Sequence, residues 1–431
     1  MSEMLVNEDV KERFILIGVQ TAERSEMIPM EDSLVELEEL VQTAGGDSVA
    51  CVVQNAQRIH PGTYMGSGKL EEVRQMLAMY DADGVVCDDE LSPAQMNNLE
   101  RILECKVLDR TMVILDIFAA RARSSEGKIQ VELAQLRYRA ARLVGMRASL
   151  SRLGGGIGTR GPGEKKLEMD RRLIHGRISK LKEDLQTVQK HRELIREKRK
   201  ENHVPTVAIV GYTNAGKSTF LNKMTGSDVL EEDKLFATLD PTTRLLELEN
   251  GQEILLTDTV GFIHKLPHHL IEAFKSTLEE AKYADYIIHM VDASDPMRDM
   301  HMQVVYDTLH DLEADQKKIL TLFNKCDRLE DRHGLHDRRA EKCLQISALT
   351  GEGLDECCRA LVELVKESYI LLERIFSYKD AGLLQLIRRE GQLLGEEYLA
   401  DGIRVKANVP VELYGRLSCC SLSSRETVTT N

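Results

Sequence analysis

Short apolar runs alternate with amphipathic stretches through the first part of the chain. Apolar runs of strand length occur at residues 14–19, 49–53 and 84–87, and residues 34–41 show the three- and four-residue spacing of a helix. Strands that alternate with helices are typical of a parallel sheet covered by helices. We therefore predict a small parallel α/β domain over residues 1–125.

Two helix starts can be assigned within this domain. Ser92 followed by Pro93 provides a capping hydroxyl and a proline at the first helical position. A short strand at residues 107–108 precedes Thr111, which we expect to cap a helix that runs to Phe118.

The apolar period becomes 3.5 residues in two long stretches, residues 128–150 and 166–200. Such a repeat on both sides of one connector predicts an antiparallel two-helix coiled coil, which we place at residues 126–203. The connector, residues 153–163, contains six glycines, one proline and Arg160. It exceeds the about two to five residues that join most helical hairpins. We interpret it as a binding tip, and the alternative is an ordinary turn.

The end of the chain has a pattern of its own. A helical stretch at residues 381–394 lies between strand-like runs at 375–378 and 403–409. This order predicts a small α+β domain over residues 371–415. The polar residues 416–431 are expected to form a disordered tail.

Composition is that of an ordinary globular protein, with 42% hydrophobic and 30% charged residues. No apolar stretch reaches the about 18–20 residues of a membrane span, and the first residues lack a signal-peptide pattern. The nine cysteines include no C-x-x-C pair, so we expect reduced thiols rather than disulfides or a zinc site. We expect a cytoplasmic protein, with peripheral attachment to a membrane left open.

Charge is distributed unevenly along the chain. The whole chain carries a net charge of −14, whereas residues 121–200 hold 22 Lys and Arg against 9 Asp and Glu, a net +13. A basic hairpin of this kind can follow the phosphates of folded RNA. The alternative is a solvated charged helix face.

A nucleotide site is predicted where the apolar run at residues 207–210 leads into G-Y-T-N-A-G-K-S, residues 211–218. In a strand–loop–helix context this pattern is a phosphate-binding loop, whose backbone N–H groups surround the phosphates. Lys217 supplies a positive charge for the β and γ phosphates, and the Ser218 hydroxyl suits Mg²⁺.

Three further motifs point to the γ-phosphate and the base. An apolar strand ends in D-T-V-G, where Asp258 can hold Mg²⁺ through water and the Gly261 N–H can meet the γ-phosphate. In N-K-C-D, the Asp327 carboxylate can accept hydrogen bonds from N1 and N2 of guanine, and adenine lacks the 2-amino donor. Residues 345–349 read as the end of a further strand followed by a loop, S-A-L, which can cap the guanine O6. The motifs together predict a domain for GTP and GDP over residues 204–370.

Between the first two motifs lies F-A-T-L-D-P-T-T-R, residues 236–244. A threonine here can complete the Mg²⁺ shell and become ordered around a γ-phosphate. Thr238 is our choice, with Thr242 and Thr243 as alternatives.

A second lysine loop, G-S-G-K at residues 66–69, resembles a phosphate loop only in part. Thr63 stands where the first glycine is required and Leu70 replaces Ser or Thr. We interpret the segment as a glycine turn that opens a helix, with a phosphate contact as the alternative.

The chain resembles the HflX-type GTPases of the translation-factor-related class in the order and the residues of these motifs. It also resembles them in G-G-G-I-G-T-R-G-P-G-E at residues 154–164. The resemblance covers about residues 10–370 and implies an α/β P-loop GTPase domain preceded by the smaller α/β domain and the hairpin. It implies Mg²⁺ ligation by Ser218 and Thr238. It implies nucleotide contacts at Gly211, Tyr212, Thr213, Asn214, Ala215, Gly216, Lys217, Ser218, Phe236, Ala237, Thr238, Leu239, Asp240, Asp258, Thr259, Val260, Gly261, Asn324, Lys325, Cys326, Asp327, Ser347, Ala348 and Leu349.

The resemblance also implies partners. Members of this family bind the large ribosomal subunit, with the hairpin directed at the peptidyl-transferase region, and some split stalled ribosomes under stress. We expect the same of this chain, acting as a monomer through its basic hairpin on ribosomal RNA. The alternative is a GTPase of tRNA modification or ribosome assembly, although the sequence shows no added catalytic residues of that kind.

The catalytic residue stays open at this point. Phe262 stands directly after D-x-x-G, where many GTPases have Gln, and a phenyl ring cannot orient water. We therefore expect slow hydrolysis that the ribosome stimulates. Asn214 lies in the loop where some related GTPases ligate K⁺, so the resemblance implies K⁺ as a further cofactor. Arg244 or His264 could contribute instead.

Overall fold

The computed structural model describes residues 11–21, 29–150, 162–201, 204–226, 235–236, 239–265, 279–366, 369–400, 402–410, 413–415 and 417. The chain divides into two compact units. The first comprises residues 1–186, 233–239 and 265–274, and the second comprises residues 187–232, 240–264 and 275–431.

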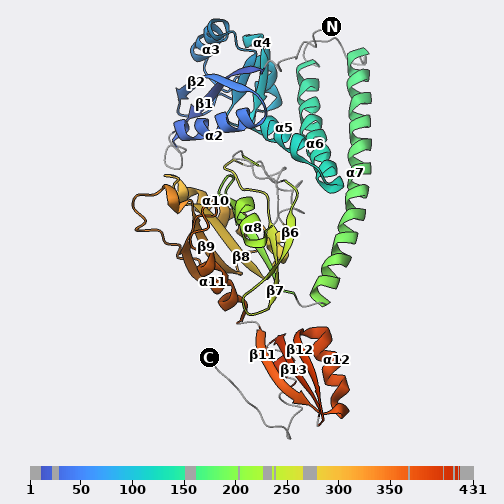
Figure 1. Ribbon diagram of the computed structural model, residues 1–431. Helices are drawn as coiled ribbons and strands as arrows, with labels where there is room; N and C mark the ends of the chain where they lie inside the picture. The colour runs from blue at the N-terminus through green and yellow to red at the C-terminus, as the bar shows by residue number, and fades with distance from the viewer. Residues whose placement is uncertain are drawn as a thin grey trace, which may run out of the picture. The chain divides into compact units, whose positions relative to one another are not determined.

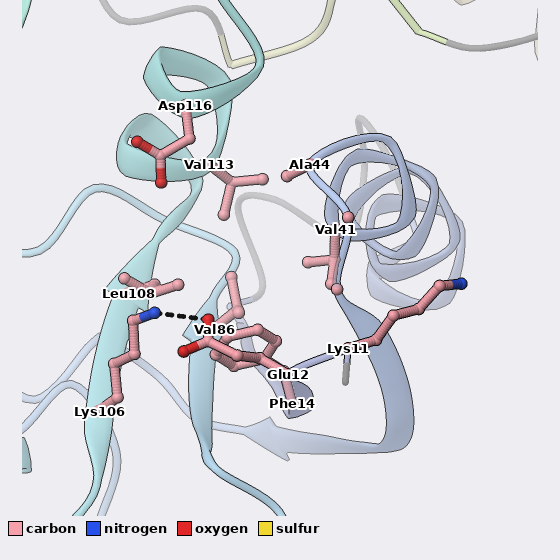
Figure 2. Close-up of a pocket in the computed structure, with 12 residues that line it drawn as sticks. Lys11, Glu12, Phe14, Val41, Ala44, Val86, Lys106, Leu108, Val113 and Asp116 are labelled. Atoms are coloured by element: carbon pink, nitrogen blue, oxygen red, sulfur yellow. Dashed lines mark hydrogen bonds and ion pairs between the residues drawn. The ribbon is translucent and has the colours of Figure 1, made fainter. Parts of the chain in front are cut away.

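The first unit contains a four-stranded parallel sheet of order β2-β1-β3-β4 (Figure 1). Its central strands are apolar on both faces, since Ile15, Leu16 and Val85 are fully buried. This confirms the predicted parallel α/β fold. The strands are β1 (Arg13–Gln20), β2 (Asp47–Asn55), β3 (Gly84–Cys87) and β4 (Lys106–Asp109), and the helices among them are α2 (Met30–Thr43), α3 (Ser67–Tyr80), α4 (Pro93–Leu103) and α5 (Arg110–Arg121).

One of the two predicted helix caps is correct. Ser92 caps α4 in a capping box with Gln95. The assignment of Thr111 as a cap is wrong, because α5 begins earlier and Asp109 accepts the Met112 N–H at 2.9 Å. A carboxylate at the N-cap position satisfies an unpaired helix N–H, and Thr111 is instead buried in the first turn.

Two long helices, α6 (Ser125–Leu150) and α7 (Pro162–Glu201), follow as predicted for the hairpin. Their narrow apolar core contains Leu133, Ile178 and Leu181. Arg177 of α7 forms a bidentate ion pair with Glu132 of α6, at 2.7 and 2.8 Å. Residues 153–161 of the predicted glycine-rich connector lie outside the described residues, and its last two residues, Pro162 and Gly163, already belong to α7.

The second unit contains a six-stranded sheet of order β10-β9-β8-β5-β7-β6 (Figure 1), parallel except for β6, which runs antiparallel to β7. Fully buried apolar side chains, among them Ile209, Leu256 and Ile288, form its core. Its strands are β5 (Thr206–Gly211), β6 (Thr242–Glu247), β7 (Glu253–Asp258), β8 (Tyr286–Asp292), β9 (Lys318–Asn324) and β10 (Lys342–Gln345), with α8 (Lys217–Thr225), α10 (Arg298–Asp311), η1 (Cys326–Arg328) and α11 (Leu354–Lys366).

The C-terminal part is an antiparallel sheet of order β11-β13-β12, formed by β11 (Tyr369–Phe376), β12 (Gln392–Leu399) and β13 (Gly402–Pro410). The helix predicted for residues 381–394 is too long, because α12 (Ala381–Glu390) stops before Gly391. The chain then extends into β12, which pairs with β13. None of the helices in the described residues combines the length and the hydrophobicity that a membrane span requires.

Candidate nucleotide site

The loop between β5 and α8 requires a glycine at its end. Gly216 has a φ of 90°, and a Cβ there would lie 2.2 Å from Nδ2 of Asn324. The missing side chain therefore lets Asn324, at the end of β9, approach the loop. The Asn324 amide donates to the Ala215 carbonyl oxygen at 2.8 Å. Two motifs that are more than 100 residues apart in the sequence are thus joined directly.

Lys217 is a buried cation in this loop, with 7% of its surface exposed. Its Nζ donates to the carbonyl oxygens of Gly211 at 3.2 Å and Tyr212 at 2.7 Å. Burial lowers the pKa of Lys217 to about 8, and the charge of Asp258 offsets part of that effect. A buried ammonium beside backbone dipoles is suited to an anionic ligand.

Ser218 and Asp258 bring hard oxygen ligands together. The Ser218 hydroxyl donates to Oδ2 of Asp258 at 2.7 Å, and Asp258 is fully buried at the end of β7. Mg²⁺ takes oxygen ligands, usually from one or two protein groups together with water and phosphate oxygens. The residues present therefore fit Mg²⁺.

The segment after Asp258 lies against the phosphate-binding loop. The Thr213 N–H donates to the Phe262 carbonyl oxygen at 2.8 Å, and the Phe262 N–H donates to the Gly211 carbonyl oxygen at 3.1 Å. A Cβ on Gly261 would lie 2.8 Å from the Thr213 Cα and 3.0 Å from Nζ of Lys217. The backbone of Gly261 therefore comes close to the lysine that would bind a γ-phosphate.

At the other end, Asn324 is bonded through both atoms of its amide. Besides donating to Ala215, it accepts the Ala348 N–H at 2.8 Å, so the S-A-L segment is fixed beside the N-K-C-D segment. Asp327 is exposed, and Cys326 is buried. A purine could thus meet the Asp327 carboxylate, while Cys326 could offer only its backbone.

Sequence reasoning missed Asp292, which orients a predicted base contact. Lys325 forms an ion pair with Asp292 at 2.8 Å, and Asp292 also accepts hydrogen bonds from the N–H and the hydroxyl of Ser294. The available signal was an aspartate at the end of a buried and mostly apolar strand, next in the sheet to the strand that carries Asn324.

Three family models match successive parts of the chain. They are described as "GTP-binding GTPase N-terminal" for residues 31–119, "GTP-binding GTPase Middle Region" for residues 121–199 and "50S ribosome-binding GTPase" for residues 206–325.

Curated relatives decide the family. A "GTPase HflX" of Lacrimispora saccharolytica is 61% identical, over 97% of this chain and 98% of that protein. The chain belongs to the HflX family of GTPases. A "GTPase HflX" of Caldanaerobacter subterraneus subsp. tengcongensis is 48% identical, over 94% of this chain and 93% of its own. A GTP-binding protein from Sulfolobus solfataricus in complex with GDP is similar in structure, with 24% identity, a TM-score of 0.43, and coverage of 83% of this chain and 99% of that one.

The HflX-type loop at residues 236–244 is only partly described. Ala237 and Thr238, the chosen Mg²⁺ ligand, lie outside the described residues. Phe236 and Leu239 are buried, and the Phe236 ring packs edge-on against Phe118 within the first unit, with ring centroids 4.7 Å apart. Their contact with a nucleotide stays a prediction.

The alternative Mg²⁺ ligands and the candidate Arg244 of this loop form contacts within the protein. Thr242 and Thr243 begin β6, where the Thr243 hydroxyl lies 3.0 Å from that of Thr257. Arg244 is exposed and donates to the Thr243 carbonyl oxygen at 3.0 Å.

The partial lysine loop of the first unit opens α3. The N–H of Gly66 donates to Oε1 of Gln54 at 2.9 Å, and Lys69 pairs with Glu72 at 2.9 Å. These contacts agree with a glycine turn at a helix start, as the sequence suggested.

Proposed function

We propose that this HflX-family GTPase is a nucleotide-controlled factor that binds the large ribosomal subunit and splits or rescues stalled ribosomes. The observation that carries the nucleotide part is the joining of the loop at Lys217 to the Asn324 motif, at 2.8 Å. One pocket can then hold triphosphate and guanine together. The matching family description, "50S ribosome-binding GTPase", supports the choice of partner.

The described part of the hairpin supports contact with RNA. Its core is a narrow seam around Leu133, Ile178 and Leu181, and most side chains of residues 168–194 of α7 are exposed. Lys180 and Lys182 are exposed in this helix. Basic side chains along a long helix can contact successive phosphates of folded RNA, with a dependence on salt.

Co-sedimentation with purified large subunits in a non-hydrolysable GTP analogue tests the ribosome part. We expect wild-type protein to pellet, and Lys180→Glu with Lys182→Glu to weaken binding at least about tenfold, since each phosphate contact contributes separately. The control is Lys342→Glu with Arg359→Glu, two exposed sites on β10 and α11 with the same change in charge. Equal loss in both double variants, or no pelleting of the wild type, would reject this surface.

Hydrolysis is proposed to be slow alone and faster on the subunit, because Phe262 replaces the glutamine of many GTPases and its side chain is buried. Turnover with and without large subunits measures this, and equal rates would refute it.

Metal dependence is a separate prediction of the proposal. Ser218 and Asp258, with Thr238, would hold Mg²⁺, and a chelator should abolish turnover. Asn214 could ligate K⁺, and identical rates in Na⁺ and K⁺ would reject that role.

The cellular task can be separated from its alternative by sucrose-gradient analysis. Conversion of whole ribosomes into subunits with GTP supports splitting. Binding to tRNA or to immature subunits without splitting would instead support a role in tRNA modification or ribosome assembly.

A further inference from the structure

Tyr212, the second residue of the phosphate-binding loop, has a buried side chain directed at the segment after D-x-x-G. Its hydroxyl accepts the N–H of His264 at 2.8 Å, and 8% of Tyr212 is exposed. The loop therefore contacts this segment through a side chain as well as through its backbone.

The Tyr212 ring is supported from α10. It stacks on the His301 imidazole with ring centroids 3.7 Å apart and an interplanar angle of 11°. His301 Nδ1 lies 3.2 Å from Oδ2 of Asp295, whose other oxygen accepts the Met297 N–H at 2.8 Å. Burial raises the pKa of Asp295, but these hydrogen bonds outweigh it, and the pKa falls below its ordinary value. The contact with Asp295 thus fixes the imidazole under the tyrosine.

The segment between β8 and α10, which contains Asp295, leads to the base side of the pocket. Asp292, which pairs with Lys325 at 2.8 Å, lies three residues before Asp295. The contacts of Tyr212 are therefore part of a series that runs from the N-K-C-D segment, through residues 292–301, to His264.

The segment that Tyr212 contacts is attached at two earlier points. The Thr259 hydroxyl donates to the Ile209 carbonyl oxygen at 2.7 Å, and Phe262 exchanges backbone hydrogen bonds with Gly211 and Thr213. The Tyr212 hydroxyl adds an attachment on the far side of Gly261 and Phe262. Losing it would widen the range of positions that the Gly261 N–H samples.

We infer that Tyr212 is a positioning residue for GTP hydrolysis, which holds the backbone around Gly261 against the phosphate-binding loop, with His301 fixing its ring. GDP has no γ-phosphate for Gly261 to meet. Loss of this attachment should therefore reduce turnover and the preference for triphosphate, while leaving GDP affinity nearly unchanged.

Tyr212→Phe in the full chain is the first test, since it removes the hydroxyl and keeps the ring. We expect kcat for GTP to fall about fivefold, the effect of one buried hydrogen bond. We also expect the dissociation constant for GDP to change less than about twofold. Hydrogen exchange in a peptide covering residues 262–265 should become faster, because its protected N–H loses its acceptor. The matched control is Tyr80→Phe in α3, which should leave all three quantities at wild-type values.

His301 provides a second test that does not alter the loop itself. His301→Ala should lower kcat about threefold, as expected for a lost ring–ring contact, and His301→Phe should restore it by supplying a flat ring. Unchanged turnover and exchange in Tyr212→Phe would overturn the inference. An equal loss of GDP affinity and kcat would also overturn it, since that is the result of a merely structural role. If Tyr212→Phe fails to fold, the His301 pair decides, and no difference between its two variants would reject the inference.

Discussion

The carboxyl ends of the two parallel sheets carry buried polar side chains, and the two units satisfy them differently. In the first unit, Asp109 at the end of β4 accepts hydrogen bonds from Tyr138 at 2.7 Å and Arg142 at 2.6 Å. Asp88, which follows β3, is paired with the buried Arg110 at 2.8 Å. Charges at this edge are compensated by side chains of the unit itself.

At the corresponding edge of the second unit, Lys217 donates to backbone carbonyl oxygens, and burial lowers its pKa to about 8. Ligands of α/β folds bind outside the carboxyl ends of parallel strands. A position at the carboxyl ends of parallel strands is therefore not sufficient to form a ligand-binding site. A buried cation held by dipoles gains from an anion, whereas a carboxylate already paired with arginine and tyrosine does not.

The largest expected difference between the two units is the effect on GTP hydrolysis of removing the lysine of each loop. Lys217→Ala should reduce GTP hydrolysis about 1000-fold, because the charge on the transferring phosphate loses its buried partner. Lys69→Ala, in the partial motif of the first unit, should change it less than about twofold, since this lysine forms an exposed pair with Glu72. A steady-state GTPase assay measures the rates of both variants. A comparable loss of activity in Lys69→Ala would contradict the distinction between the two loops.

Breaking the buried pair of Arg110 and Asp88 should destabilise the first unit without changing the protein's affinity for GDP. Arg110→Ala should lower the free energy of unfolding by about 3–5 kcal/mol, because its guanidinium pairs with both the buried Asp88 and Glu36. Asp88 would keep Lys265 as a partner, whereas the guanidinium would be lost to both carboxylates. Arg110→Met with Asp88→Leu should cost less, since neither member of this buried pair is left without the other. Denaturant unfolding gives the stabilities. A tenfold weaker GDP affinity in the double variant would assign this edge a ligand-binding role.

Base selection should follow the exposed carboxylate of the second unit. Asp327→Asn should weaken GTP binding about 100-fold, because hydrogen bonds to a charged acceptor are lost. Xanthosine triphosphate has a carbonyl in place of the 2-amino group and should bind this variant better than it binds wild type. Fluorescent-nucleotide competition measures both affinities, and an unchanged order of the two nucleotides would remove Asp327 from the base site.

The smallest effect is a pH dependence. Below pH 8, Lys217 is charged both in the free protein and in the complex, so GDP affinity should be flat. A bound phosphate raises the pKa of Lys217, so above pH 8 binding must take up a proton, and the dissociation constant should rise up to about tenfold per pH unit. Calorimetry in two buffers at pH 8.5 measures proton uptake directly. Zero uptake would show that Lys217 does not meet the phosphate.

Much of this organisation could be predicted from sequence, where local patterns carry it. The spacing of Gly211, Lys217 and Ser218 after an apolar strand specified the loop, and the 3.5-residue repeat specified the helices of the hairpin. Contacts between distant segments carry no such signal. The pairs Asp292–Lys325 and Tyr212–His301 depend on which strands and helices become neighbours.

The errors have local causes. Asp109 rather than Thr111 caps α5, because the strand ends one residue before the helix begins and its last carboxylate reaches Met112. The helix α12 ends early because β13 offers a pairing partner to the residues after Gly391. Tertiary pairing of this kind overrides a local helical pattern.

The most direct measurement is a calorimetric titration of the full chain with GDP and with ADP. If Lys217 and Asp327 belong to one pocket, GDP should bind at least about 100-fold more tightly, because ADP satisfies the phosphate end and leaves the carboxylate without N–H donors. Equal affinities for the two nucleotides would contradict the account.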